Sequence, residues 1–175
     1  LTTRAMQMLN EFPRPTIALV QGAAFGGGCG IVCCVDVALA GPEAIFGLTE
    51  VRVGVAPTPI STHMVHAMGF RQARRYAVTG ERFDAAEAVR IGLVHEVVPA
   101  DRIEARLAAV LEEVLLAAPG AAAVTKASML GANGLTLDRR AMESLAQEGW
   151  MQRASTEGRE GLAAFRAKRR PAWFG

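Results

Sequence analysis

The chain has 175 residues, of which 51% are hydrophobic and 21% charged, and its formal net charge at pH 7 is +2. This length is enough for one domain with a sizeable core, and so small a net charge gives no reason to expect nucleic acid or an acidic membrane as a partner. No segment approaches the roughly 18 consecutive apolar residues that a membrane-spanning helix needs. We therefore expect a globular protein whose partners include neither nucleic acid nor a membrane.

The cysteines and the first residues indicate where in the cell the protein is expected and whether the chain is part of a longer protein. Three cysteines, of which Cys33 and Cys34 are adjacent, fit a reducing cytosol better than a disulfide framework. The first residues show no signal peptide, so we expect a cytoplasmic protein. The chain starts at Leu1 within a helical pattern over residues 4–9, and we therefore expect it to be a piece of a longer protein.

The segments in chain order predict short strands with helices between them. Strands are expected over residues 17–20, 37–40, 44–47 and 93–98. Helices are expected after the glycine run near residue 27 and over residues 60–68, 70–78 and 85–91, the last with Asp84 as N-cap. Residues 50–59 contain prolines and a glycine and predict a structured loop.

The last third of the chain is helical in pattern almost throughout. Asp101 is expected to cap a helix that ends near residue 117. Further helices are expected over residues 121–130, 137–154 and 157–168. This change predicts an α/β domain over residues 1–118 and a C-terminal helical region over residues 119–175.

The run Phe25-Gly26-Gly27-Gly28-Cys29-Gly30 is the most informative segment. Glycines at the start of a helix leave backbone N–H groups unshielded, where they suit a negative oxygen. A dinucleotide fingerprint fails because Ile31 stands at its third glycine position, and a P-loop fails because no lysine precedes Lys126. Two interpretations stay open: an oxyanion site on the N–H of Gly27, or close packing of a strand on a helix.

Glu50 is the leading candidate for proton transfer. It lies among apolar residues, just after an expected short strand. Loss of hydration raises the pKa of a carboxylate, and a glutamate so placed is suited to exchange protons near neutral pH. The alternatives are an ion pair with Arg52 or a side chain that points to water.

Cys29 offers a different chemistry. A cysteine at a helix N-terminus can be a nucleophile, with His63 or His66 as its base. Cysteine is also a small buried hydrophobe, and a nucleophile elbow is not formed because Gly30 follows directly. His63 and His66 have no third ligand at metal spacing, so no metal site is expected; His95 is expected to be structural.

Taken together, several motifs resemble the crotonase (enoyl-CoA hydratase/isomerase) family, in the same order and over essentially the whole chain. They are Pro15-Thr16-Ile17-Ala18-Leu19-Val20-Gln21-Gly22, Phe25-Gly26-Gly27-Gly28, Cys34-Val35-Asp36-Val37-Ala38, Phe46-Gly47-x-x-Glu50, Gly54-Val55-x-Pro57, Thr79-Gly80-Glu81-Arg82-Phe83-x-Ala85 and Glu160-Gly161-x-x-Ala164-Phe165-x-x-Lys168.

The resemblance implies an α/β fold: a spiral of ββα units whose N-terminal part is missing here, completed by helices that form homotrimers, usually paired into hexamers. It implies an acyl-CoA thioester as substrate, with no cofactor other than the coenzyme A that the substrate carries. One oxyanion donor would be the N–H of Gly27, and Glu50 would transfer protons. Gly26, Gly27 and Pro57 would contact the substrate. Phe165 and Lys168 would reach the coenzyme A that is bound by a neighbouring subunit.

The chain also departs from the family pattern. Hydratases commonly carry a second glutamate where this chain has Gly30, so Glu50 either handles both proton transfers or serves a one-base double-bond shift. Gly30 and the segment Thr58-Pro59-Ile60-Ser61 resemble the methylglutaconyl-CoA hydratase branch. We expect Gly30 to leave space beside the acyl chain, which would suit a branched substrate of acyl-CoA or fatty acid catabolism.

Four functions therefore remain in view. The first is an enoyl-CoA hydratase for a branched acyl-CoA, and the second a Δ3,Δ2-enoyl-CoA isomerase. The third is a non-catalytic acyl-CoA-binding or assembly module. The fourth, a hydrolase that uses Cys29, would form a covalent adduct.

Overall fold

The structure is a computed structural model that describes residues 2–54, 56–132, 151 and 154–173. The chain divides into two compact units. Unit 1 comprises Leu1–Phe12 and Thr16–Leu107, and unit 2 comprises Pro13–Pro15 and Ala108–Gly175. The domain boundary expected at residue 118 stays a prediction.

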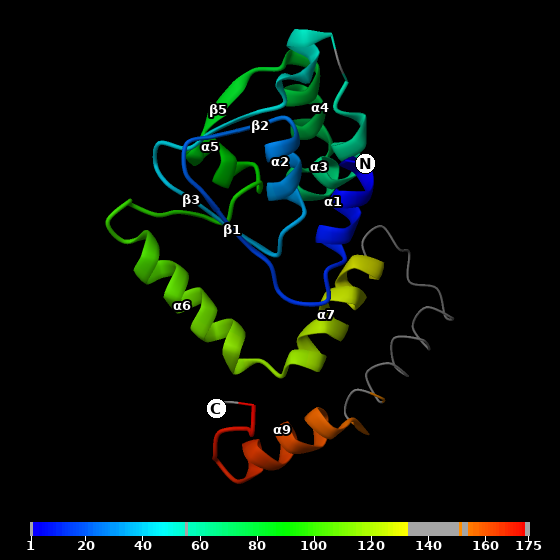
Figure 1. The fold of residues 1–175 in the computed structure, drawn as a ribbon, viewed down its shortest axis with the longest axis vertical. Coiled ribbons are helices and arrows are strands. Elements are labelled where there is room, and N and C mark those ends of the chain that lie inside the picture. The colour runs from blue at the N-terminus through cyan, green and yellow to red at the C-terminus, as the bar shows by residue number, and fades with distance from the viewer. Residues whose placement is uncertain (1, 55, 133–150, 152–153, 174–175) are drawn as a thin grey trace. The chain divides into compact units, whose positions relative to one another are not determined.

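Unit 1 contains two small sheets (Figure 1), and from β1 to β4 the chain alternates between them. One sheet has the order β1 (Ile17–Val20), β3 (Val37–Ala40), β6 (Glu96–Val97), and the other has the order β2 (Ala23–Phe25), β4 (Ile45–Gly47), β5 (Arg82–Asp84). β1 pairs with β3 and β2 pairs with β4, both in parallel. Equivalent strands of successive repeats are therefore neighbours, which is the spiral that the sequence predicted.

Each strand pair leads into helical segments. α2 (Gly27–Cys33) follows β2, whereas two short 3-10 helices follow β4: η1 (Thr49–Val53) and η2 (Thr58–Ile60). The loop expected over residues 50–59 thus contains ordered helical turns. Prolines limit regular structure there because they lack a backbone donor.

Three strands differ from the sequence prediction. β2 and β5 were not expected, since three residues are too few to show an alternating pattern. The strand expected over residues 93–98 is reduced to β6. Leu93 and Val94 instead donate their backbone N–H groups to the carbonyl of Ala88, at 2.9 and 3.2 Å, so the end of the preceding helix holds them.

The helices of unit 1 largely agree with those predicted from the sequence. α1 (Thr2–Asn10), α3 (Ser61–Met68), α4 (Phe70–Thr79) and α5 (Ala85–Arg90) form as expected. Gly69, with φ +73°, separates α3 from α4. The predicted cap of α5 is confirmed, because the side chain of Asp84 accepts a hydrogen bond from the N–H of Glu87 at 2.8 Å.

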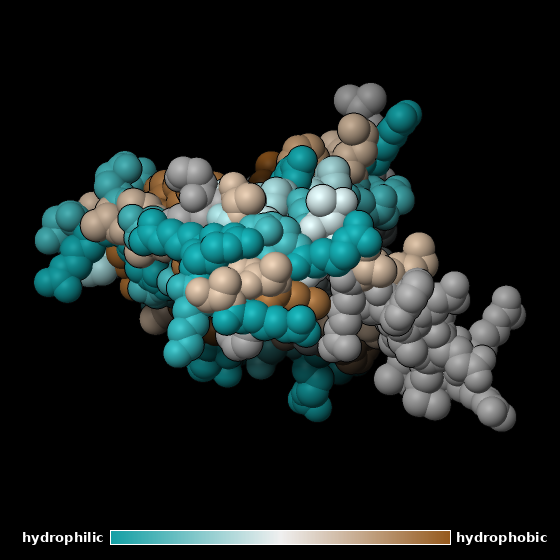
Figure 2. All heavy atoms as spheres, turned by 90° about the horizontal axis from the view of Figure 1, so that it is seen from below, coloured by the Kyte–Doolittle hydropathy of each residue, from teal (hydrophilic) through white to brown (hydrophobic). Residues whose placement is uncertain are grey.

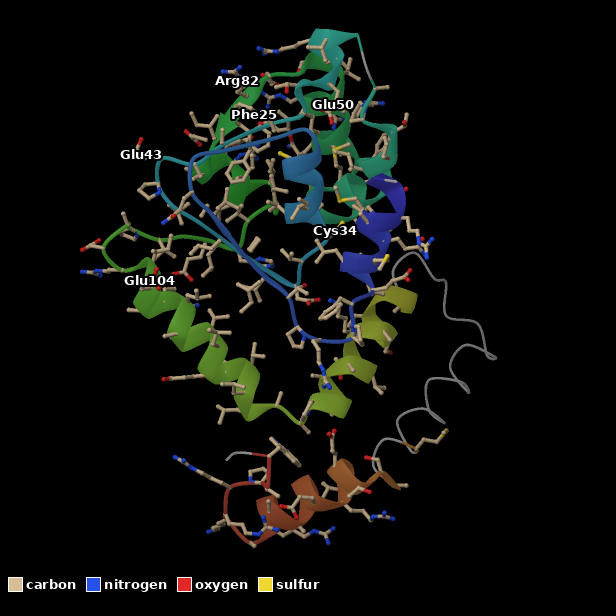
Figure 3. The ribbon with its side chains drawn as sticks, in the orientation of Figure 1. Phe25, Cys34, Glu43, Glu50, Arg82 and Glu104 are labelled. Atoms are coloured by element: carbon tan, nitrogen blue, oxygen red, sulfur yellow. The ribbon has the colours of Figure 1, made fainter. Side chains whose placement is uncertain are left out.

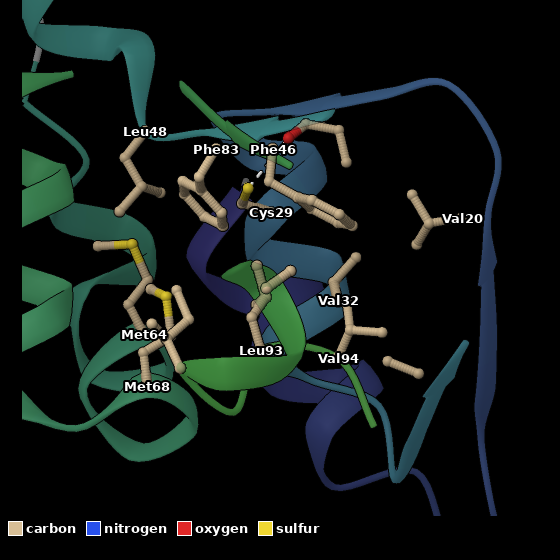
Figure 4. Close-up of a cluster of buried hydrophobic side chains, with 14 of the residues drawn as sticks. Val20, Cys29, Val32, Phe46, Leu48, Met64, Met68, Phe83, Leu93 and Val94 are labelled. Carbon is tan, nitrogen blue, oxygen red and sulfur yellow. Dashed lines mark hydrogen bonds between the residues drawn. The ribbon is translucent and has the colours of Figure 1, made fainter. Parts of the chain in front are cut away.

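Aromatic side chains from three elements form the centre of the core of unit 1, and Figure 4 shows two of them, Phe46 and Phe83. Phe46 on β4 and Phe83 on β5 stack with ring centroids 5.8 Å apart, and Tyr76 on α4 lies 4.2 Å from Phe83. Cys29 and Val32 bring α2 into the same cluster. This packing holds α2 against β4. α2 begins in the glycine run, and β4 is followed by the turn that contains Glu50.

Unit 2 consists of helices. α6 (Ile103–Leu116) begins in unit 1 and continues into unit 2, which also holds α7 (Pro119–Ala132) and α9 (Thr156–Arg166). The carboxylate of Glu157 on α9 accepts hydrogen bonds from the N–H groups of Gly120 and Ala121, at 2.7 and 3.1 Å. It thereby caps α7. Most of the helix expected over residues 137–154 lies outside the described residues.

Polar and apolar side chains are both exposed at the surface. Hydrophilic residues cover most of the face drawn in Figure 2, and apolar residues form smaller areas between them. No single helix among the described residues has the length and apolar character needed to cross a membrane. Only α6 and α7 taken together meet that criterion, and the chain bends by 99° between them.

Candidate functional site

The glycine run forms a tight bend between β2 and α2. Gly26 has φ +54°, a conformation that L side chains rarely adopt, and its N–H donates to the carbonyl of Gly47 at 2.9 Å. A Cβ at Gly26 would lie 3.0 Å from Oε1 of Glu50. Gly26 therefore has to be glycine both for the bend and for the approach of this carboxylate.

The amide of Gly27 lies at the first position of α2. The first backbone hydrogen bond of the helix turn is donated by Gly30 to the carbonyl of Gly26, at 3.1 Å. Gly27 itself is exposed, and no acceptor for its N–H is found among the described residues. Such an amide can receive an oxygen from a ligand.

Glu50 lies in η1, where the chain leaves β4 (Figure 3). Its Oε2 is buried and has no hydrogen-bond partner in the described part of the chain. The alternative ion pair with Arg52 is not formed; the Arg52 side chain instead lies beside Gly80, with Nε 3.2 Å from where a Cβ of Gly80 would be. A buried carboxylate oxygen without a partner is costly, so it marks a place where a ligand can bind.

The space expected at Gly30 is not open, and this expectation was wrong. A Cβ at Gly30 would lie 2.5 Å from Cγ2 of Ile60 and 3.3 Å from Cε of Met6. Ile60 and Met6 are 2% and 6% exposed. The sequence could not indicate this, because the two side chains come from segments far from residue 30.

The cysteine hypothesis finds no support in the geometry. Cys29 is fully buried, and its Sγ donates to the carbonyl of Ala24 at 3.0 Å. Burial, and to a smaller extent the nearby charge of Glu50, raises the pKa of the Cys29 thiol to about 11, although a hydrogen bond to the backbone of Gly47 acts in the opposite direction. The thiol is therefore neutral near pH 7 and serves the core.

The histidines have no evident chemical role. His95 accepts a hydrogen bond from the backbone N–H of Ala38 at 2.9 Å through Nδ1, which confirms a structural role. Burial and the neighbouring His66 lower the pKa of His63. Within the described residues, no group of three or more His, Cys, Asp or Glu side chains is placed to hold a metal ion.

A row of residues beside the bend was missed by the sequence reasoning. Gly47 on β4 pairs with Phe25 on β2 and with Arg82 on β5. Because Gly47 has no side chain, the Arg82 guanidinium reaches across it and lies 4.8 Å from the centroid of the Phe25 ring. The signal was present in Phe46-Gly47 and Arg82-Phe83, but only the strand register aligns them.

The remaining predicted site residues lie elsewhere. Pro57 is half-buried at the start of η2 in unit 1. Lys168 belongs to unit 2, is exposed, and with φ +52° forms the left-handed end of α9. The side chain of Phe165 lies outside the described part of the structure.

A separate apolar cavity of about 490 Å³ lies between β1 and α2. Leu19, Val20, Ile31 and Val35 are among its lining residues, whereas Glu50, Gly27 and Ile60 are not. Ala24 and Gly28, which lie next to the bend, also line this cavity, but the Glu50 side chain does not.

Known proteins resemble this chain over nearly its whole length. Residues 2–175 match the family model described as Enoyl-CoA hydratase/isomerase. The solved structure of an enoyl-CoA hydratase from Shewanella pealeana superposes with a TM-score of 0.94 and 40% identity, covering 98% of this chain and 64% of that one. An enoyl-CoA hydratase/isomerase from Marinobacter aquaeolei gives a TM-score of 0.93 and 38% identity, covering 99% and 66%.

A mouse protein named enoyl-CoA hydratase domain-containing protein 3, mitochondrial, is 30% identical over 172 residues, covering 98% of this chain and 57% of that protein. The chain thus spans less than two thirds of the length of these relatives. The family model nonetheless covers all but the first residue, and the fold agrees with the solved structures. The chain belongs to the enoyl-CoA hydratase/isomerase family and has the crotonase fold.

Proposed function

We propose that the protein is an enoyl-CoA hydratase in which the N–H of Gly27 binds the thioester oxygen and Glu50 transfers the proton. The observation that carries this proposal is the buried Oε2 of Glu50, which has no partner in the described part of the chain. The position of Glu50 against Gly26, beside the open amide of Gly27, supports it. An acid–base group and an oxyanion donor then lie at one bend.

The reaction would run as follows. The oxygen of a water molecule forms a bond to C3 of the 2-enoyl thioester while Glu50 takes a proton from that water. The electrons of the double bond move to C2 and the thioester oxygen, and the resulting enolate oxygen accepts a hydrogen bond from Gly27. Glu50 then gives its proton to C2, which restores the carboxylate. The hydrogen bond from Gly27 lowers the activation barrier because it becomes stronger as negative charge develops on the thioester oxygen.

The family supports an acyl-CoA substrate, and further contacts belong to the same proposal. Gly26 and Pro57 would line the substrate path. Phe165 and Lys168 would reach the coenzyme A of a neighbouring subunit, since an ammonium group suits a phosphate. A homotrimer or a dimer of trimers, formed through the helices of residues 119–175, is part of this proposal, as are a cytoplasmic location and the absence of any cofactor besides substrate coenzyme A.

A second candidate, a Δ3,Δ2-enoyl-CoA isomerase, is favoured by one observation. Residue 30 is glycine and supplies no second carboxylate beside Glu50, and Ile60 and Met6 occupy the space there. A double-bond shift needs only one base, which removes a proton from C2 and returns it to C4. The branched acyl group remains a prediction, although the open space on which it rested is filled.

The test compares wild type with Glu50→Gln on a 2-enoyl-CoA and a 3-enoyl-CoA, each in a straight and a branched form. We expect Glu50→Gln to lose about 10²- to 10⁴-fold in turnover, the usual contribution of a positioned acid–base group. Binding of the coenzyme A ester should change little, because the amide keeps the shape of the side chain. Glu43→Gln, a change at an exposed glutamate, serves as the control.

Each outcome separates the candidates. Hydration of the 2-enoyl ester supports the hydratase, and conversion of the 3-enoyl ester supports the isomerase. A wild-type protein that binds acyl-CoA but converts neither ester would support the non-catalytic module. Wild-type turnover by Glu50→Gln would refute the assigned role.

A further inference from the structure

Two glycines, Gly26 at the N-cap of α2 and Gly30 one turn further on, leave the backbone of α2 without side chains at two points on the side where Glu50 lies. Gly26 and Gly30 are four residues apart, so their Cα atoms lie on the same face, about one helical turn from each other. The hydrogen bond from the N–H of Gly30 to the carbonyl of Gly26, at 3.1 Å, confirms this turn. Whatever lies against this face can approach the backbone of α2 closely.

Two different groups lie against this face. At Gly26 it is the Glu50 carboxylate, whose Oε1 is 3.0 Å from where a Cβ would be. At Gly30 it is Ile60, whose Cγ2 and Cβ are 2.5 and 3.2 Å from that point, with Cε of Met6 at 3.3 Å. The carboxylate and the Ile60 side chain are therefore neighbours along α2, about one turn apart.

The Ile60 side chain is held in place. It is 2% exposed and ends η2, and its N–H donates to the carbonyl of Pro57 at 3.2 Å. Pro57 and Pro59 restrict the backbone of this turn, and a β-branched side chain has few rotamers. Met6, by contrast, is unbranched and adaptable. Of the two side chains that lie against Gly30, Ile60 is therefore the one that cannot easily move.

We propose that Ile60 is a specificity-determining residue, which closes the space one helical turn beyond Glu50 and limits the size of the acyl group that can lie there. This inference rests on the proposed function, because it assumes that Glu50 acts on an acyl thioester. An acyl group bound at Glu50 that runs along α2 toward Gly30 would meet Ile60 about one helical turn away. An acyl group that extends from Glu50 toward Ile60 would therefore have to be short, and the branch of the predicted substrate would have to lie on another side of Glu50.

The experiment measures kcat/KM of the purified protein for crotonyl-CoA, a longer straight 2-enoyl-CoA and one branched at C3. For Ile60→Val and Ile60→Ala, we expect the ratio of the larger substrates to crotonyl-CoA to rise, by about tenfold for Ile60→Ala. One methylene group in an apolar pocket changes discrimination by this order. Ile91→Val is the matched control, because Ile91 is a core isoleucine that is 6% exposed, and its ratio should stay as in wild type.

A pair of variants tests the contact itself. Gly30→Ala places a methyl group against Ile60 and should lower kcat/KM for every substrate. The double variant Gly30→Ala/Ile60→Ala should recover most of this loss, because the second change removes the clash. Thermal unfolding of each variant shows whether it is folded, and Ile60→Val remains informative if Ile60→Ala is not.

The inference and the proposed function can fail separately. If Ile60→Val and the double variant keep the wild-type substrate ratios while Glu50→Gln is inactive, Ile60 does not set specificity and the function stands. If Glu50→Gln remains active, the proposed function itself is refuted, and the inference is refuted with it.

Discussion

The two units bury their apolar side chains very differently. In unit 1, Phe46, Leu48 and Tyr76 are at most 2% exposed, and one continuous cluster joins the strands to α2, α3 and α4. In unit 2, Leu115 on α6 and Met129 on α7 are 68% and 63% exposed, and α7 buries none of its described side chains.

This difference indicates what each unit is stabilised by. In unit 1 the bend and Glu50 lie beside a continuous cluster of buried apolar side chains, whose burial stabilises this unit. In unit 2 a polar contact joins α7 and α9: the carboxylate of Glu157 accepts hydrogen bonds from the N–H groups of Gly120 and Ala121. Leu115 and Met129, on successive helices of unit 2, are therefore the exposed apolar residues at which we test the proposed assembly.

The largest effect should come from the core of unit 1. Phe46→Ala should lower the free energy of unfolding by about 3–5 kcal/mol, because it removes a buried ring and leaves a cavity. Leu115→Ala should change it by only about 0.5 kcal/mol at low protein concentration, since the side chain is exposed. Urea denaturation followed by circular dichroism measures both, and equal costs would remove the contrast between the units.

The next effect concerns association. If unit 2 carries the subunit interface, Leu115→Glu and Met129→Glu should raise the dissociation constant of the assembly by at least about tenfold, or about 1.4 kcal/mol. Sedimentation velocity over a concentration series measures this change. Val78→Glu is the control, because Val78 is 71% exposed on α4 of unit 1. Dissociation by Val78→Glu alone would place the interface on unit 1.

A smaller effect should follow from the polar link in unit 2. Glu157→Ala removes the acceptor for two backbone N–H groups at the start of α7 and should cost about 1 kcal/mol, as the loss of a helix cap does. Hydrogen exchange at Gly120 and Ala121 should become faster. Glu112→Ala, at an exposed position of α6, should leave their exchange unchanged; slow exchange in Glu157→Ala would contradict the capping role.

The smallest effect is a dependence on pH in unit 1. Hydrogen bonds from Arg90 first, and from Tyr76 second, lower the pKa of Glu87 to about 2. Because the folded pKa is below the unfolded value near 4.3, this stabilisation is present above that value and is lost as the pH falls towards 2. The melting temperature of Glu87→Gln should therefore fall less between pH 6 and pH 3 than that of wild type.

Glu43→Gln is the control for this measurement, because Glu43 is an exposed glutamate on the same unit. It should keep the acid sensitivity of wild type. Identical acid profiles for wild type and Glu87→Gln would show that the Glu87 interactions do not contribute to stability in acid.

Much of the fold could be predicted because the relevant interactions are local. Residues 17–20 and 37–40 are short apolar runs bounded by glycine or proline, and both are strands with the expected bounds. Asp84 caps α5 through a residue only three positions further on. β2 and β5 escaped prediction because each has three residues and depends on pairing with β4.

The candidate site divides in the same way. The glycine run and Glu50 were identified from residue types and from the order of the family motifs. Open space was predicted at Gly30, where the Ile60 side chain in fact lies. This prediction was wrong because the residues near position 30 do not indicate that a side chain from η2 packs there. Arg82 on the Phe25 ring was not foreseen either, because strand register creates it.

The amino-acid sequence by itself determined the family, the bend after β2 and the Asp84 cap of α5, because these depend on neighbours in the chain and on backbone freedom at glycine. Only the tertiary structure decided that the Glu50 carboxylate lies against Gly26 and that Ile60 lies against Gly30. Parallel pairing of β2 with β4 sets Phe25 opposite Gly47, and this register brings residues more than twenty positions apart to one face of α2. Register is a property of the packed sheets, so no local pattern contains it.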